Sequence, residues 1–183
     1  MKKLALALAA SATLAFGLPA GAAATTIETP EAKMEAASAA DMARTDMIEL
    51  FGDRELLPNQ FLWRKNAPTS GEPRVVISLF DQLAYLYRGD ELVAVASISS
   101  GKPGKDTPTG IFPIQEKKVF HRSAKYDDAP MPYMQRLDQY GIALHAGHNP
   151  GEPASQGCVR LPKEFAARLF KVTDIGTPVL IGI

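Results

Sequence analysis

Alternating apolar and polar residues in the second half of the chain predict a series of β-strands. Three segments there are rich in β-branched and aromatic residues, which favour a pleated and half-buried surface, namely 75–79, 83–87 and 91–99. The polar pairs Asp81-Gln82 and Gly89-Asp90 separate these segments at hairpin positions. The pattern therefore predicts three strands joined by tight turns.

Three more strands are predicted after residue 110. Residues 111–119 resume the strand pattern, but Pro113 interrupts it, which suggests an edge strand or a bulge. The apolar segment 141–144 leads into His145, and residues 176–181 form the last predicted strand.

Two further segments are predicted to be loops. Residues 101–110 are dense in turn-forming glycine, proline, aspartate and threonine. Residues 121–138 are long and irregular, and a loop of that length in a compact domain usually has a function, such as a lid or a binding wall.

The helical pattern is weaker. Residues 162–172 predict an amphipathic helix, with Pro162 in the first turn and Phe165, Leu169 and Val172 on one face. A second helix is predicted over 41–51, with Asp41 as N-cap and Gly52 as stop. Residues 23–40 predict a linker or a weak helix.

The predicted fold class is therefore mostly β, a curved mixed sheet arranged as a sandwich or a barrel-like structure, with one or two helices. No internal repeat is visible, and the order of elements does not match alternating βαβ units.

The amino terminus predicts export. Lys2-Lys3 precedes the uncharged apolar run 4–18, and Pro19-Ala-Gly-Ala22 offers small residues for cleavage near Ala22 or Ala24. The run is shorter than the about 20 residues that span a bilayer, so an uncleaved anchor is the weaker alternative. No cysteine lies nearby, which excludes a lipoprotein anchor. Residues 1–24 are thus predicted to be a signal peptide, and the protein is expected in the periplasm.

Composition narrows the function further. The 183 residues carry 20 basic and 20 acidic side chains, so the formal net charge is zero and gives no indication of nucleic-acid binding. After the predicted signal peptide, residues 25–73 are expected to be a linker or helical segment, and 74–183 a single domain.

The single cysteine, Cys158, cannot form an intramolecular disulfide. It lies in a loop that begins after His145 and is rich in glycine and proline. Three interpretations of Cys158 are open: a small buried residue, a metal ligand or a catalytic thiol.

A catalytic thiol needs a base within hydrogen-bond reach, and His145 stands at the end of a predicted strand, where side chains are well fixed. Cys158 follows Ser155-Gln156-Gly157, and the glycine allows the backbone to bend closely around a substrate. The N–H groups of Gly157 and Cys158 are then candidates for an oxyanion hole, worth about 3 kcal/mol for each donor. This arrangement predicts acyl transfer through a thioester.

A metal site would use His145, His148, Cys158 and His121. His145 and His148 are three residues apart, a spacing that needs a helix, and the nearby Gly147 and Pro150 disfavour one. No second cysteine or carboxylate cluster supports this alternative, so no metal site is predicted, and His148 is expected to be solvated.

Several segments resemble the L,D-transpeptidase (YkuD-type) catalytic domain family. That family has a histidine on a strand and then a Ser/Thr-His-Gly-Cys block, followed one residue on by asparagine or arginine; here the block reads Ser-Gln-Gly-Cys-Val-Arg from Ser155 to Arg160. The resemblance extends over about 74–183, through segments 75–87, 107–112, 129–133 and 176–179.

The resemblance implies a role for each site residue. Cys158 would be the nucleophile, and His145, oriented by the backbone carbonyl of Ala146, would take up and return its proton. Arg160 would hold the loop or a substrate carboxylate. Tyr133 and His121 would line the pocket for the acyl donor.

One departure from the family is the residue before the Gly-Cys pair, where this chain has Gln156 in place of histidine. Glutamine donates a hydrogen bond but carries no proton or charge. If that histidine were the base, the protein would be a non-catalytic wall-binding module. Because His145 supplies a base and the oxyanion donors are backbone groups, we expect activity.

The resemblance also implies the reaction. The Cys158 thiolate would attack a peptidoglycan tetrapeptide stem after the L-centre of its diamino acid and release D-alanine, without a cofactor. The acceptor would be an amine of a second stem, the terminal lysine of an outer-membrane lipoprotein, or water, in which case the enzyme is an L,D-carboxypeptidase. Carbapenem-type β-lactams are expected to acylate Cys158.

Overall fold

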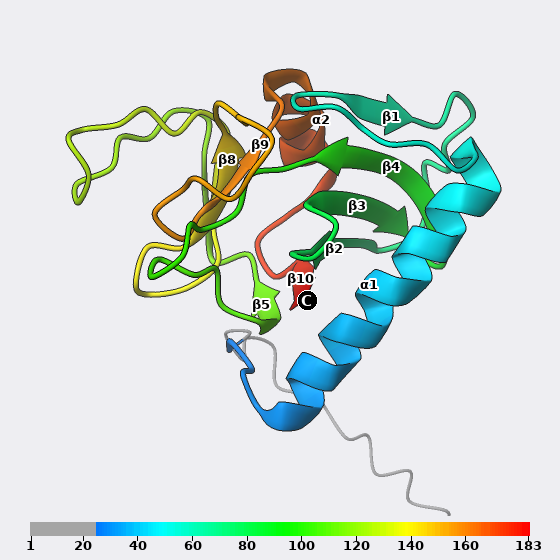
Figure 1. The fold of residues 1–183 in the computed structure, drawn as a ribbon, viewed down its shortest axis with the longest axis horizontal. Helices are drawn as coiled ribbons and strands as arrows, with labels where there is room; N and C mark the ends of the chain where they lie inside the picture. Colours follow the sequence, from blue (N-terminus) through cyan, green and yellow to red (C-terminus); the bar gives the residue numbers. More distant parts are fainter. Residues whose placement is uncertain (1–24) are drawn as a thin grey trace, which may run out of the picture.

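The strands form two sheets that are not closed into a barrel (Figure 1). A computed structural model describes residues 25–183, so the predicted signal peptide lies outside the described residues. One sheet has six strands in the order β1-β4-β3-β2-β10-β5, and the other has four in the order β6-β7-β8-β9. The prediction of a mostly β fold with mixed sheets is confirmed, and the barrel-like alternative is not observed.

The larger sheet contains β1 (Phe61–Trp63), β2 (Pro73–Ser78), β3 (Leu83–Arg88), β4 (Glu91–Ser97), β5 (Gly110–Pro113) and β10 (Pro178–Gly182). The smaller sheet contains β6 (Glu116–Lys118), β7 (Met134–Arg136), β8 (Ala143–Ala146) and β9 (Val159–Leu161). The helices are α1 (Pro30–Phe51) and α2 (Lys163–Val172).

The predicted hairpins are confirmed, since β2, β3 and β4 pair antiparallel in sequence order. Pro113 ends β5 and separates it from β6, as an interrupted strand requires. Two interpretations were incomplete: β7 lies inside the segment predicted as an irregular loop, and β1 and β9 were not predicted. Each of these strands has only three residues, too few for a period of two to be recognised.

Helix α1 is longer than predicted, and Asp41 is not its N-cap. The helix begins at Pro30, and the hydroxyl of Thr29 accepts a hydrogen bond from the Ala32 N–H, while Gly52 follows its last turn as predicted. Up to Ala43, the buried face of this helix consists of alanines (Ala32, Ala36, Ala40 and Ala43). A stripe of such small residues gives little hydrophobic signal, which explains why 23–40 suggested a linker. Neither helix within 25–183 is both long and apolar enough to cross a membrane.

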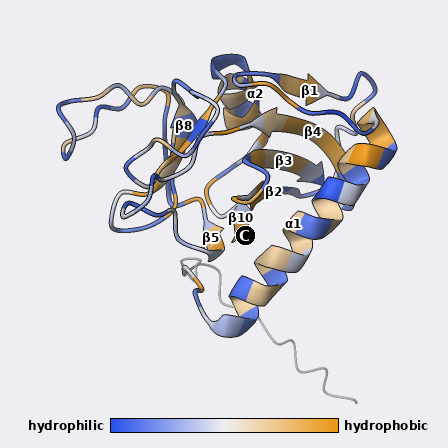
Figure 2. Ribbon diagram, viewed as in Figure 1, coloured by the Kyte–Doolittle hydropathy of each residue, from blue (hydrophilic) through white to orange (hydrophobic). Residues whose placement is uncertain are grey.

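Helix α1 covers one face of the larger sheet (Figure 1). Met47 is fully buried there against Tyr85 and Tyr87, and the Tyr87 hydroxyl donates to the Asp46 carboxylate at 2.6 Å. Figure 2 shows hydrophobic residues along β4 and in the last turns of α1. This contact makes the segment before the catalytic-domain resemblance an integral part of the fold.

The opposite face of the larger sheet packs against the smaller sheet and α2. Leu144 and Ala146 of β8 belong to this core together with Phe165 and Leu169 of α2. Because successive side chains of a strand point to opposite faces, Ala143 and His145 are turned to the other face of the smaller sheet. That face carries the candidate site.

Candidate active site

The register of the smaller sheet brings His145, Cys158 and Arg160 to one face. Strands β8 and β9 are parallel, and His145 is paired with Arg160. Cys158 lies directly before β9, and the same register continued by one step places it beside Ala143. Cys158 indeed packs against the cluster that contains Ala143. The nucleophile and base predicted from the sequence are therefore diagonal neighbours, a placement that side chains can bridge.

A cavity of about 600 Å³ opens on this face. Of the residues predicted for the site, it is lined by His121, His145, Ser155, Gln156, Cys158 and Arg160. Tyr133 does not line it, because its ring packs on Phe170 with the centroids 6.0 Å apart. His148, expected to be solvated, is exposed but also borders the cavity.

His145 is buried and oriented by the backbone. Its Nδ1 lies 2.9 Å from the carbonyl oxygen of Ala146, which confirms the expected orienting contact. A carbonyl only accepts hydrogen bonds, so Nδ1 carries the proton and Nε2 keeps its lone pair. Burial is the main cause that lowers the pKa of His145 below 6.5, and the hydrogen bond to Ala146 opposes it. A neutral imidazole with a free Nε2 is suited to act as a general base.

The surroundings of Cys158 favour the protonated thiol. Burial is the main cause that raises its pKa above 9.0; the backbone N–H of Ala143 lowers the pKa, and the charge of Asp138 raises it. The thiol donates to the carbonyl oxygen of Gly141, with the sulfur 3.5 Å from that oxygen. The two shifts thus favour a neutral thiol beside a neutral imidazole, and a thiolate would require transfer of the proton to a base such as His145.

Ser155 shapes the turn that carries the thiol. Its buried hydroxyl donates to the Cys158 carbonyl at 2.5 Å and accepts from the Gly157 N–H at 3.0 Å. The Gly157 N–H is therefore occupied, which corrects its predicted place in the oxyanion hole. Within residues 25–183, the Cys158 N–H has no hydrogen-bond partner and remains the candidate donor.

Position 157 requires glycine, both for its backbone conformation and for lack of space around it. Its φ is 112°, and a Cβ atom there would lie 2.7 Å from Cδ1 of Ile142. Its carbonyl accepts a 2.8 Å hydrogen bond from the buried hydroxyl of Thr107, which itself accepts from the Gly101 N–H at 2.9 Å. Thr107 is thus a positioning residue for the Cys158 turn, a role that sequence reasoning missed although the segment was part of the resemblance.

We expect Thr107→Val to lower both stability and activity. The substitution keeps the shape of the side chain but leaves the Gly157 carbonyl and the Gly101 N–H without their partner, at a cost of about 1–3 kcal/mol. Thermal unfolding and the rate of Cys158 acylation measure the two effects. Thr109→Val is the matched control, because no hydrogen bond of the Thr109 side chain is present within 25–183; an equal loss in both variants would contradict the assigned role.

A second residue that sequence reasoning missed is Asp138. One oxygen of its buried carboxylate accepts from three consecutive N–H groups, those of Tyr140 at 2.9 Å and of Gly141 and Ile142 at 2.8 Å. This turn sets the position of the Gly141 carbonyl that contacts the thiol. The available signal was an aspartate three residues before a glycine, a common turn composition.

Arg160 and Gln156 border the cavity in different ways. The Arg160 guanidinium donates a long hydrogen bond of 3.4 Å to the His148 carbonyl, consistent with a role in holding the loop. Gln156 is partly exposed, and its side chain makes no hydrogen bond to residues 25–183, so its amide is free to contact a ligand.

Within the described part of the chain, no three His, Cys, Asp or Glu side chains are grouped as metal ligands.

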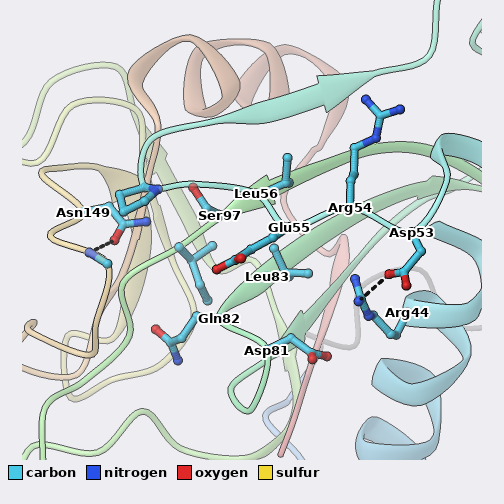
Figure 3. Close-up of a pocket in the computed structure, with 13 residues that line it drawn as sticks. Arg44, Asp53, Arg54, Glu55, Leu56, Asp81, Gln82, Leu83, Ser97 and Asn149 are labelled. Carbon is cyan, nitrogen blue, oxygen red and sulfur yellow. Dashed lines mark hydrogen bonds and ion pairs between the residues drawn. The ribbon is translucent and has the colours of Figure 1, made fainter. Parts of the chain in front are cut away.

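A different cavity, of about 560 Å³, lies between the end of α1 and the turn before β3 (Figure 3). Its charged side chains include Arg44 and Asp53, which form a 3.2 Å ion pair. Its lining contains neither His145 nor Cys158. The candidate residues His145 and Cys158 therefore lie at the cavity on the smaller sheet and not at this one.

Comparison with known proteins agrees with this geometry. A family model described as the L,D-transpeptidase catalytic domain (YkuD) matches residues 72–181. No curated protein sequence matches the chain significantly.

Several solved structures have a similar fold. An L,D-transpeptidase from Mycobacterium smegmatis is 18% identical, with a TM-score of 0.56 over 60% of this chain and 58% of that chain. One from Xylanimonas cellulosilytica is 26% identical, with a TM-score of 0.56 over 64% of each chain. L,D-transpeptidase 3 from Mycobacterium tuberculosis, solved with a faropenem-derived adduct, is 22% identical, with a TM-score of 0.55 over 61% of each chain. This chain therefore spans less than two thirds of the length of these proteins.

Proposed function

Because the chain belongs to the L,D-transpeptidase catalytic domain family, we propose that it is a cysteine-dependent peptidoglycan L,D-transpeptidase. The observation that carries the proposal is the pairing of a free thiol with an oriented imidazole in one cavity. His145 is held by the Ala146 carbonyl with Nε2 unprotonated, and Cys158 lies on the same face of the sheet. This is the arrangement that nucleophilic acyl transfer requires.

The reaction starts when His145 Nε2 takes the proton of Cys158 and the sulfur attacks the carbonyl carbon of the diamino acid in a tetrapeptide stem. The Cys158 N–H donates to the resulting oxyanion. When the tetrahedral intermediate collapses, the bond to the terminal D-alanine breaks, and His145 gives its proton to the departing amine. The acyl group is left on the sulfur as a thioester.

An acceptor then completes the cycle. Its amine attacks the thioester, His145 takes the proton of that amine, and the proton finally returns to the Cys158 sulfur. A stem amine as acceptor gives a 3-3 cross-link, the lysine of an outer-membrane lipoprotein gives an anchored protein, and water gives a carboxypeptidase. The predicted signal peptide would deliver the enzyme to the periplasm, where these substrates lie.

Muropeptide analysis tests the proposal. Mature protein incubated with tetrapeptide-rich sacculi is expected to form new cross-linked dimers, identified by mass spectrometry after digestion of the glycan. Tripeptide products without dimers would indicate hydrolysis instead of transfer. A muropeptide profile identical to that of Cys158→Ala would refute an enzymatic function.

The acidic limb of the pH profile reports on His145. The base must be neutral in the free enzyme, so kcat/KM falls as the pH drops through the pKa of His145. Because burial lowers that pKa below 6.5, we expect activity to persist below pH 6.5 before it declines. The measurement is kcat/KM for a soluble stem peptide across the acidic range. A midpoint above 6.5 would contradict a buried neutral base.

A non-catalytic wall-binding function is the second candidate, and Gln156 is the feature that favours it. We expect Gln156→His to change kcat/KM by far less than the about 10²–10⁴-fold that a general base contributes, since His145 already fills that role. The same muropeptide assay measures this. Activity that appears only in Gln156→His would show that the natural protein is inactive.

A further inference from the structure

Arg136 faces the thiol across the smaller sheet. It is paired with Glu116 on one side and with Ala143 on the other, and Cys158 follows Ala143 in the continued register. Paired residues of neighbouring strands point to the same face, so these four side chains form one row. Ala143 is buried between them in a cluster with Met131 and Met134, and Arg136 and Cys158 both line the cavity.

The guanidinium of Arg136 is fixed by one hydrogen bond, and only one of its three nitrogens takes part in it. Its Nε donates to the Glu116 carboxylate at 2.8 Å. Hydrogen bonds from Lys118 and Arg136 are the main causes that lower the pKa of Glu116 to about 2, so this anchor is charged at working pH. Within residues 25–183, the two terminal nitrogens of Arg136 make no hydrogen bond. They remain available to a ligand in the cavity.

These free nitrogens lie close to the reacting sulfur. A Cβ atom placed on Gly141 would be 3.9 Å from Nη1 of Arg136, and the carbonyl oxygen of Gly141 is 3.5 Å from Sγ of Cys158. One glycine thus separates the cation from the nucleophile. When the reacting carbonyl carbon of a substrate lies at the sulfur, another group of the same substrate, a few bonds from that carbon, can contact the guanidinium.

The position of the leaving group decides which part of the substrate can contact Arg136. His145 must protonate the leaving amine, so the leaving group lies on the side of His145 and its pair partner Arg160. Arg136 lies in the row of the thiol itself, beyond Ala143, and not in the row of His145 and Arg160. With the leaving group in the row of His145, the row of Arg136 is left for the acyl part, which stays on the enzyme as the thioester.

We propose that Arg136 binds a free carboxylate on the acyl-donor part of the substrate and so selects donors that carry one. This inference rests on the proposed function. A guanidinium held through one nitrogen presents its remaining donors as a fork that matches a carboxylate. In a peptidoglycan stem the carboxylate has two sources, the side chain of the diamino acid or the acidic residue that precedes it. A donor with lysine as diamino acid lacks the first.

Three synthetic tetrapeptide donors test the inference: one with both carboxylates free, and two in which one or the other is an amide. With the natural protein, amidation of the recognised carboxylate is expected to lower kcat/KM about 10–100-fold, the range of a hydrogen bond to a charged group. In Arg136→Gln, kcat/KM for the free-acid donor falls by a similar factor, and the preference between free acid and amide disappears. Arg136→Lys retains part of the preference because it retains the charge.

Lys118→Gln is the matched control, since it removes a neighbouring cation that contacts the same Glu116 but does not line the cavity. It is expected to keep the preference. Equal kcat/KM for all three donors with the natural protein, or an undiminished preference in Arg136→Gln, would overturn the inference. If no donor is turned over at all, the proposed function fails, and binding of the three donors to Cys158→Ala by calorimetry still decides whether Arg136 selects a carboxylate.

Discussion

Replacing Cys158 with alanine will abolish acyl transfer, with a fall in turnover of at least about 10³-fold, since no thioester forms without the thiol. The same change will abolish covalent capture of a carbapenem. Opening of the β-lactam ring adds the whole drug to the sulfur, so intact-protein mass spectrometry of the natural protein will show one adduct of the full drug mass. Two solved structures with a similar fold contain imipenem and a faropenem-derived adduct.

The position of the adduct provides the decisive check. Cys158 is the only cysteine of the chain, so a thiol adduct can map to one peptide only. Cys158→Ser is the conservative control, because the hydroxyl fills the same space but is a far weaker nucleophile at neutral pH. Turnover that persists in both variants, or a carbapenem adduct on another residue, would contradict the assignment of the nucleophile.

Much of the architecture could be predicted because it follows from local pattern. The strands β2, β3 and β4 have six or seven residues each with turn formers between them, so a period of two is visible. Helix α1 was only half predicted, since its first half buries alanines whose contribution depends on close approach to the sheet and not on hydrophobicity. Three-residue strands such as β9 are defined by their partners and carry no pattern of their own.

The candidate catalytic residues could be recognised in the sequence, but the residues that hold them in place could not. His145 and Cys158 were visible as rare residue types in a loop rich in glycine, and the Ala146 contact followed from the family resemblance. Thr107 and Asp138 act through backbone groups that are distant in sequence or hidden in a turn. No periodicity marks such residues, because a hydrogen bond between a side chain and a remote carbonyl depends on tertiary structure.

The same limitation applies to the oxyanion hole. Sequence proximity suggested that the N–H groups of Gly157 and Cys158 act together, but the Ser155 hydroxyl accepts the first of them. The serine of this turn therefore has a structural role, to fix the direction of the peptide groups around Cys158. Together with Thr107 on the Gly157 carbonyl, it pre-organises the donor that remains.

Asp138 has two effects on Cys158, the proposed nucleophile, and two substitutions separate them. Its carboxylate holds the turn at Gly141 through three hydrogen bonds, and its charge raises the pKa of Cys158. We expect Asp138→Ala to lose about 3 kcal/mol of stability, because the turn loses its acceptor, and to lose most activity as the Gly141 carbonyl moves. Asp138→Asn keeps an oxygen acceptor but removes the charge, so the turn is expected to persist.

The sign of the second effect is therefore testable in Asp138→Asn. Without the negative charge, formation of the thiolate is less costly, so the pKa of Cys158 falls relative to the natural protein. Alkylation of the single thiol by iodoacetamide across pH measures that pKa directly, and thermal unfolding measures the turn. Asp106→Asn is the control, since Asp106 is exposed and its carboxylate is not hydrogen-bonded within 25–183. An unchanged or raised thiol pKa in Asp138→Asn would show that Asp138 acts on Cys158 through the turn alone. Equal stability of the two Asp138 variants would show that the three hydrogen bonds do not hold the turn.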